Sequence, residues 1–240
     1  MTRLVPNGRP ATVRHTPIEA VALTDAEIDH SLGIVLLREA RCLPLYATVG
    51  VRTVLDRDSR FLSVARAFAE IPVTELPIDV AVPLCCRDGG ESGLAAEAFL
   101  VPGDPPRFAG ADAEGHTVGL LIHEIETGCR CAFVPGCGAL TPAILARLAA
   151  ADVLLFDGTF WTDEEPVEAG IGPRTAQQMG HLPIAGAAGS LEQLSRLPCR
   201  HRVYTHINNT NPVLVEQSRE RALVNEAGLT VGFDGWQVAV

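Results

Sequence analysis

Short apolar runs alternate with segments of helical periodicity along most of the chain. Apolar or extended segments of strand length occupy residues 20–23, 43–47, 73–86, 153–156 and 202–205. Apolar residues at helical spacing predict helices over residues 31–40, 49–55, 141–150, 191–197 and 213–227. One of these helices has a clear start signal, because Thr141 can cap its N-terminus and Pro142 suits its first turn. The alternation of strands and helices predicts an α/β sandwich with mixed sheets.

Two hairpins are predicted in addition. Apolar segments 117–122 and 131–134 flank the turn Glu126-Thr127-Gly128, which is typical of a β-hairpin in the middle of the chain. Segments 230–233 and 236–240 predict a second hairpin near the end.

Composition narrows the class of protein. The chain has 240 residues, of which 47% are hydrophobic, and this suits one large globular domain. A formal net charge of −10 disfavours binding to a phosphate backbone, so nucleic acid is not an expected partner. The sequence shows neither a secretory signal nor an apolar stretch of membrane-spanning length, which predicts a cytoplasmic protein. The 7 cysteines are therefore expected as thiols rather than disulfides.

Polar clusters follow three of the predicted strands, at residues 24–30, 157–159 and 206–211. In α/β folds, the carboxyl ends of strands line the crevice in which ligands bind. Each cluster also has a simpler explanation. Asp29 is a common type of helix cap, His206 could be a hydrogen-bonded core histidine, and the asparagine run 208–211 could form a turn. Their occurrence at three strand ends favours a shared metal or acid/base site.

The first cluster resembles the H-x-H-x-D-H motif of the metallo-β-lactamase superfamily. Asp25 and Glu27 stand in place of its first two histidines, whereas Asp29 and His30 keep the last two positions. Four motifs in order resemble the pyrroloquinoline quinone (PQQ) biosynthesis protein B family of that superfamily, at residues 23–33, 156–161, 179–182 and 206–212. The resemblance implies a metallo-β-lactamase-like αββα sandwich.

The resemblance covers residues 16–240, and residues 1–15 form a stretch that does not match. Members of the family carry further N-terminal strands and a cysteine-rich loop that binds a structural zinc. We therefore expect an N-terminally truncated domain without the structural zinc. Apolar area left uncovered costs about 25 cal/mol per Å², so we also expect a less stable chain.

For the metal, the resemblance implies a single ion held by Asp29, His30 and His206. The second metal position of the superfamily lacks its histidines at Asp25 and Glu27, and its bridging carboxylate falls near 136–138, where the sequence is Gly-Cys-Gly. One carboxylate with two imidazoles is the ligand set of non-haem Fe(II) oxygenases, and the same three ligands suit Zn(II). Fe(II) is the favoured ion, with Zn(II) as the alternative.

Further polar residues are candidates around this metal. Asp157, His181, Glu27 and Asp25 are candidate acid/base groups. Candidates for holding a cofactor or substrate are Asn208, Asn209 and His116. For each of them, the alternative is an ordinary hydrogen-bonded polar residue.

The resemblance implies an Fe(II)-dependent hydroxylase that acts on tyrosine in a small peptide-derived or amino-acid-derived precursor of PQQ. Two other classes stay open: a carrier that transports PQQ or its precursor, and a metal-dependent hydrolase. Other PQQ biosynthesis proteins are candidate partners, and a homodimer is left open.

Overall fold

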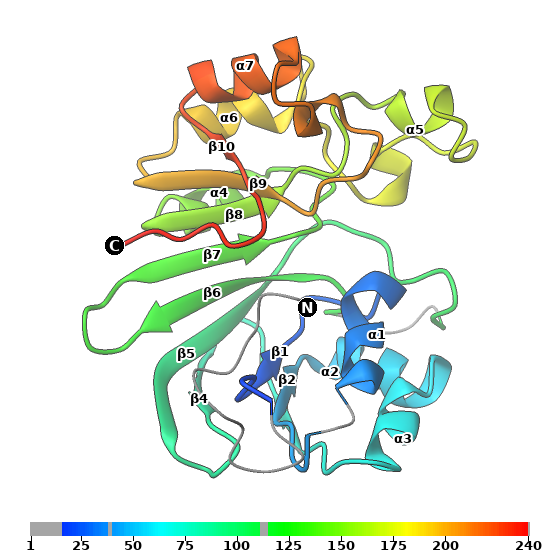
Figure 1. Ribbon diagram of the computed structural model, residues 1–240, viewed down its shortest axis with the longest axis vertical. Helices are drawn as coiled ribbons and strands as arrows, with labels where there is room; N and C mark the ends of the chain where they lie inside the picture. The colour runs from blue at the N-terminus through cyan, green and yellow to red at the C-terminus, as the bar shows by residue number, and fades with distance from the viewer. Residues whose placement is uncertain (1–15, 38–39, 111–114, 240) are drawn as a thin grey trace. The chain divides into compact units, whose positions relative to one another are not determined.

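The computed structural model describes residues 16–37, 40–110 and 115–239 (Figure 1). Contacts within the chain divide it into two compact units, which are described one at a time. The first comprises residues 1–100, 105–118 and 124–126, and the second comprises 101–104, 119–123 and 127–240. The predicted boundary at residue 15 lies outside the described residues.

The first unit is built on a small parallel sheet in the order β1-β2-β3, with Val21 opposite Leu45 and Leu45 opposite Val73. Helices connect these strands (Figure 1), and they pack on a buried core that includes Leu43, Leu62 and Leu55. An antiparallel pair, β4 and β5, completes the unit. Its elements are β1 (Val21–Ala22), α1 (Ile28–Leu36), β2 (Leu45–Ala47), α2 (Val49–Thr53), the π-helix Val54–Asp58, α3 (Phe61–Arg66), β3 (Val73–Glu75), β4 (Ala81–Cys85) and β5 (Glu91–Leu100).

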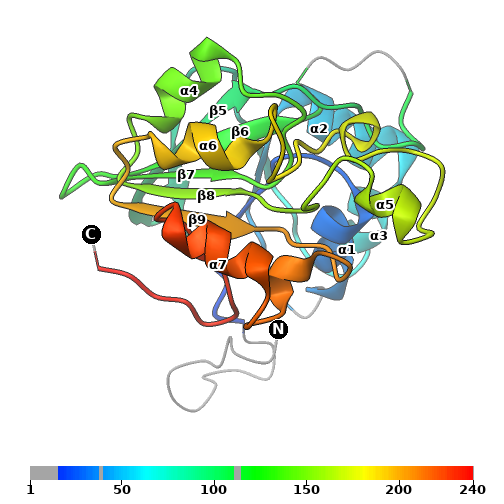
Figure 2. The same ribbon diagram turned by 90° about the horizontal axis from the view of Figure 1, so that it is seen from above.

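The second unit contains strands in the order β10-β9-β8-β7-β6. The pair β6–β7 is antiparallel, whereas β7–β8, β8–β9 and β9–β10 are parallel. Helices α4 and α6 cover the same face of β7, β8 and β9 (Figure 2). Its elements are β6 (Val118–Glu124), β7 (Arg130–Val134), α4 (Pro142–Leu148), β8 (Val153–Asp157), α5 (Glu165–Glu168), the 3-10 helix Gln177–Met179, α6 (Ser190–Ser195), β9 (His201–Thr205), the 3-10 helix Pro212–Leu214, α7 (Arg219–Glu226) and β10 (Thr230–Val231).

Most predicted elements are present with shifted ends. The central hairpin is confirmed as β6 and β7, with Leu120 opposite Phe133. The start of α4 is also confirmed, because the Thr141 side chain accepts a hydrogen bond from Ile144 N. Among the described residues, no helix is long and apolar enough to cross a membrane.

Three details of the prediction were wrong. The helix expected over 213–227 is interrupted, because Pro212 opens a single 3-10 turn and Ser218 then caps a separate helix, α7, by accepting from Arg221 N. The terminal hairpin is not formed in the described part of the chain, since β10 pairs in parallel with β9 and residues 236–239 are not a strand. Helix α1 begins at Ile28, before the predicted start at residue 31, so Asp29 and His30 lie in its first turn.

Candidate metal centre

In the first unit, a buried carboxylate holds the ring of His30. Asp25 is 4% exposed, and its Oδ1 and Oδ2 lie 2.7 and 2.8 Å from His30 Nδ1. The carboxylate also accepts from Glu27 N at 3.0 Å and from the Thr24 hydroxyl at 2.9 Å. A carboxylate accepts only, so His30 carries a proton on Nδ1, and the lone pair of the neutral ring is on Nε2.

The environment of Asp25 keeps it ionised. Burial raises its pKa, but the hydrogen bond and the charge of His30, with the donors Glu27 N and Thr24 Oγ1, lower the pKa by more, so it lies below the ordinary value for aspartate. A charged carboxylate beneath an imidazole makes Nε2 a better electron donor to a metal.

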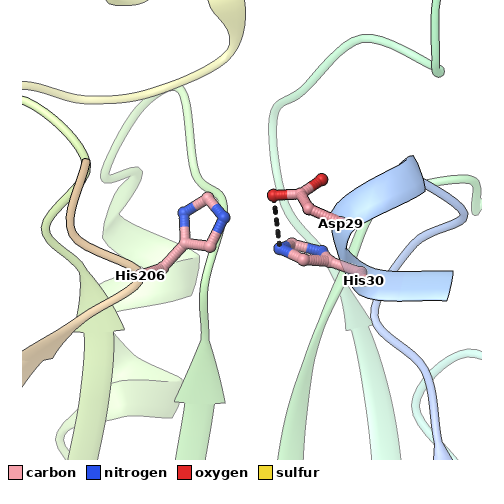
Figure 3. Close-up of side chains that lie close together, drawn as sticks. All are labelled: Asp29, His30 and His206. Atoms are coloured by element: carbon pink, nitrogen blue, oxygen red, sulfur yellow. Dashed lines mark ion pairs between the residues drawn. The ribbon is translucent and has the colours of Figure 1, made fainter. Parts of the chain in front are cut away.

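Helix α1 brings Asp29 beside His30 (Figure 3). The two residues are adjacent in its first turn, and Asp29 Oδ2 lies 3.8 Å from His30 Nε2. Two atoms that bind one ion at about 2.0–2.2 Å can be at most about 4.4 Å apart, so one ion can contact both. The Asp29 side chain is 70% exposed, which suits a ligand that an incoming ion must reach.

In the second unit, parallel pairing of β8 and β9 aligns the ends of two predicted clusters. Asp157, the last residue of β8, lies opposite Thr205, the last residue of β9. His206 follows β9 directly (Figure 3), and its φ of 52° is in the left-handed region that non-glycine residues rarely adopt. Such backbone conformations are costly and cluster at functional sites.

Asp157 is the centre of hydrogen bonding here. Its side chain is fully buried, and Oδ2 accepts from Cys137 N at 3.1 Å and from His181 Nδ1 at 2.8 Å. The other oxygen, Oδ1, accepts from Thr159 N at 3.0 Å and from the Thr159 hydroxyl at 2.6 Å. Burial raises the pKa of Asp157, but the charge and hydrogen bond of His181, with the nearby His206 and the hydrogen bonds from Thr159, lower it to about 2. Both oxygens are engaged by protein donors, so Asp157 suits orientation of its neighbours better than coordination.

His181 and His206 lie together above Asp157. Their rings are stacked, with centroids 5.4 Å apart and planes at 23°. His181, His206 and Asp157 also form a group whose ligand atoms lie within 4.8 Å of one another. By their spacing alone, these three residues could hold a metal ion.

Cys137 lies in the segment 136–138, near which the resemblance to the superfamily predicts a bridging carboxylate. Its thiol donates to Ala139 O at 3.2 Å, and burial raises the pKa of the thiol to about 12. A buried neutral thiol is a poor substitute for a bridging carboxylate. All 7 cysteines of the chain are free thiols.

The other candidate residues have more ordinary surroundings. Glu27 is at the N-cap of α1 without a side-chain capping bond, and His116 is in the first unit beside Thr117, whose backbone bridges to Asp25. Asn208 donates to the Thr210 hydroxyl at 2.6 Å, and Asn209 is exposed. Roles for these four in binding or catalysis stay predictions.

Two residues of the second unit have roles that sequence reasoning missed. Asn211 is buried and its amide donates to Gly158 O at 2.9 Å, which ties the turn after β9 to the turn after β8. Thr159 contacts both Asp157 and His206. The only sequence signal was their membership of the polar clusters at the strand ends.

Comparison with known proteins identifies the class first. Residues 3–207 match the model of the beta-lactamase superfamily domain. Human tRNase Z, short form, matches with a TM-score of 0.56 over 92% of this chain and 78% of that chain at 15% identity, which shows the fold alone. The chain therefore has the metallo-β-lactamase fold, as predicted.

The particular family follows from closer relatives. Coenzyme PQQ synthesis protein B of Gluconacetobacter diazotrophicus is 38% identical over 94% of this chain and 75% of its own length. The protein of that name from Methylobacterium nodulans is 42% identical over 93% of this chain and 73% of its own length. A crystal structure described as Zn(2+)-bound PqqB from Methylobacterium extorquens matches with a TM-score of 0.84 and 36% identity, over 98% of this chain and 78% of that chain. The chain belongs to the coenzyme PQQ synthesis protein B family.

Proposed function

We propose that this protein is a metal-dependent enzyme of PQQ biosynthesis whose single ion is held by Asp29, His30 and His206. The observation that carries the proposal is the hydrogen bonding of Nδ1 in the two histidines. Each Nδ1 lies against a buried polar group, Asp25 for His30 and Thr159 for His206. Both rings are thereby arranged to offer Nε2, which is how proteins commonly prepare histidines to bind a metal.

The donor set suits one ion rather than two. Asp29 and His30 offer a carboxylate oxygen and an imidazole nitrogen within the span of one ion. Asp25 is hydrogen-bonded to His30, and Cys137 is a neutral thiol that donates to Ala139 O, so two of the groups at the expected second metal position are engaged elsewhere. The Methylobacterium extorquens relative is described as Zn(2+)-bound, which supports metal binding in this chain.

We further propose that the working ion is Fe(II) and that the reaction is hydroxylation of a tyrosine in a peptide-derived PQQ precursor in the cytoplasm. O₂ is the oxidant: one of its atoms enters the ring, and an external two-electron reductant converts the other to water. One carboxylate and two imidazoles leave coordination positions open on Fe(II), and the bound ion supplies the redox chemistry that oxygen activation requires. Zn(II) fits the same donors and lacks that redox chemistry. Metal identity therefore separates a hydroxylase from the other functions.

His181 and Asp157 fit a proton-transfer pair. His181 Nδ1 donates to Asp157 Oδ2 at 2.8 Å, which places the lone pair of the neutral ring on Nε2. The carboxylate, with a pKa of about 2, stays charged and stabilises a proton taken up at Nε2.

The test measures oxygen consumption by the full chain, loaded with Fe(II) or Zn(II), in the presence of a Glu–Tyr dipeptide and an added two-electron reductant such as ascorbate, with the dipeptide omitted as the control. We expect consumption coupled to hydroxylated product with Fe(II) only, and a metal content of one ion per chain. A protein that binds PQQ or the dipeptide equally well without metal, and consumes no oxygen, would be a carrier. Tight binding of two metal ions per chain, together with hydrolytic activity, would show that the protein is a hydrolase.

A further inference from the structure

The hydroxyl of Thr159 lies where the side chains of the second unit meet. Its Oγ1 is 2.6 Å from Asp157 Oδ1, 2.8 Å from His206 Nδ1, 3.0 Å from His206 O and 3.1 Å from His181 Nδ1. The residue is 7% exposed, so its hydrogen bonds are largely shielded from competing water.

A count of protons assigns each bond. The hydroxyl has one proton, and a carboxylate can only accept, so the 2.6 Å contact between Thr159 Oγ1 and Asp157 Oδ1 requires that proton. The hydroxyl oxygen then accepts a proton, and His206 Nδ1 at 2.8 Å is nearer than His181 Nδ1 at 3.1 Å. His181 Nδ1 has its own acceptor in Asp157 Oδ2 at 2.8 Å. The chain of donors therefore runs from His206 Nδ1–H to the Thr159 hydroxyl and from that hydroxyl to Asp157.

We propose that Thr159 is a positioning residue that fixes the Nδ1–H tautomer and the ring orientation of His206, so that Nε2 is the metal-binding atom. The inference rests on the proposed metal site. The carboxylate of Asp157 is 3.9 Å from His206 Nδ1, too far for a direct hydrogen bond. The threonine hydroxyl fills that gap and lets one buried carboxylate orient two histidines.

The backbone of Thr159 supports the same turn. Its carbonyl accepts from Asn208 N at 3.1 Å, and Gly158 N donates to Thr205 O at 2.8 Å. These bonds bracket His206, whose φ of 52° needs support from its surroundings. Side-chain and backbone contacts of the Gly158–Thr159 turn thus constrain both the ring and the main chain of the proposed ligand.

The tautomer can be measured without metal. Long-range ¹H–¹⁵N correlation spectra distinguish Nδ1–H from Nε2–H imidazoles, and the His206→Ala and His181→Ala spectra assign the two rings. In the metal-free full chain we expect His206 as the Nδ1–H tautomer in the wild type and in Thr159→Ser, which keeps the hydroxyl. In Thr159→Val, which keeps the shape and loses the hydroxyl, we expect a mixture of both tautomers.

Zinc affinity is the second readout. Loss of an orienting partner typically weakens metal binding by about 10–100-fold, and we expect this for Thr159→Val, with Thr159→Ser within a few-fold of the wild type. The matched control is Thr141→Val, which removes a threonine hydroxyl that caps α4 and is hydrogen-bonded to no histidine among the described residues. It should leave both the tautomer and the zinc affinity unchanged. Thr159→Ala serves as a second hydroxyl-free variant if the valine variant does not fold.

The outcomes separate this inference from the proposed function. A wild-type tautomer and wild-type zinc affinity in a folded, hydroxyl-free variant would overturn the role of Thr159 while leaving the metal site intact. Wild-type zinc affinity in His206→Ala would instead refute the proposed metal site. In that case, the tautomer measurement still decides whether Thr159 orients the ring.

Discussion

His30 and His206, the two histidines proposed as ligands, are supported in different ways. His30 is bound directly by the carboxylate of Asp25, at 2.7 and 2.8 Å. His206 reaches the carboxylate of Asp157 only through the Thr159 hydroxyl, because its Nδ1 is 3.9 Å from that carboxylate. Asp157 also binds His181 directly. In the first unit, one carboxylate therefore orients one histidine, whereas in the second unit one carboxylate orients two.

The difference suggests different functional consequences. A carboxylate that is hydrogen-bonded to one histidine alone orients that ring and strengthens its bond to the metal. A shared carboxylate can orient a ligand and also support proton transfer by a second histidine. Substitutions in the first unit should therefore affect mainly metal affinity, and those in the second unit should affect affinity and turnover separately.

The largest effect is expected from removing either ligand. His30→Ala and His206→Ala should each abolish metal-dependent turnover, because the remaining protein ligands hold an ion poorly. Metal content and dipeptide-dependent oxygen consumption measure this. His201→Ala is the matched control, since His201 lies at the opposite end of β9 from His206 and packs against Trp236. If the control loses metal to the same extent, the effect is not specific to the proposed ligands.

The next effect should distinguish the two carboxylates. Asp25→Asn should weaken metal binding by about 10–100-fold, as is typical for loss of an orienting partner. Asp157→Asn keeps one oxygen that can accept from the Thr159 hydroxyl, so it should keep stoichiometric metal. It should slow turnover by about 10²–10⁴-fold, the range for a lost acid/base function. Metal titration and turnover at saturating metal separate these outcomes. Complete loss of metal in Asp157→Asn would make Asp157 itself a ligand.

Acid unfolding gives a smaller effect with a defined sign. The pKa of Asp157 is lowered to about 2, so its ionised form stabilises the folded state above the ordinary aspartate pKa of about 3.9. That stabilisation is lost as the pH falls from about 4 through about 2, and its size is about 2 kcal/mol. Denaturant unfolding of the metal-free chain at several pH values should show the loss in the wild type. Asp157→Asn should lack this part of the pH dependence, and an identical slope in both proteins would contradict it.

The smallest effect concerns the fold of the second unit alone. Thr141→Ala removes the side-chain cap of α4, and should lower the free energy of unfolding by about 0.5–2 kcal/mol. Denaturant unfolding measures this loss. Zinc affinity and turnover should match the wild type, because Thr141 takes no part in either histidine network. A changed zinc affinity would show that zinc binding depends on the stability of the fold in general. Zinc affinity could then not be used to compare how His30 and His206 are supported.

Much of the fold was readable from local pattern. The apolar runs that became β2, β8 and β9, and the Thr141–Pro142 start of α4, depend on residues close in sequence. The pairing of strands depends on longer-range contacts. A strand was predicted at residues 230–233, but it pairs in parallel with β9, with Thr230 opposite Val203, and not in the expected terminal hairpin.

The candidate site, like the fold, was predicted only in part from the sequence. Sequence alone determined which residue types stand at the strand ends, and the family motifs pointed to Asp29, His30 and His206 as ligands. Tertiary structure decided what each neighbour does: Asp25 orients His30, Thr159 connects His206 to Asp157, and His181 reaches Asp157 from 24 residues away. The physical reason is that the orientation and proton position of an imidazole depend on hydrogen-bond partners, and folding alone brings such partners together from distant parts of the chain.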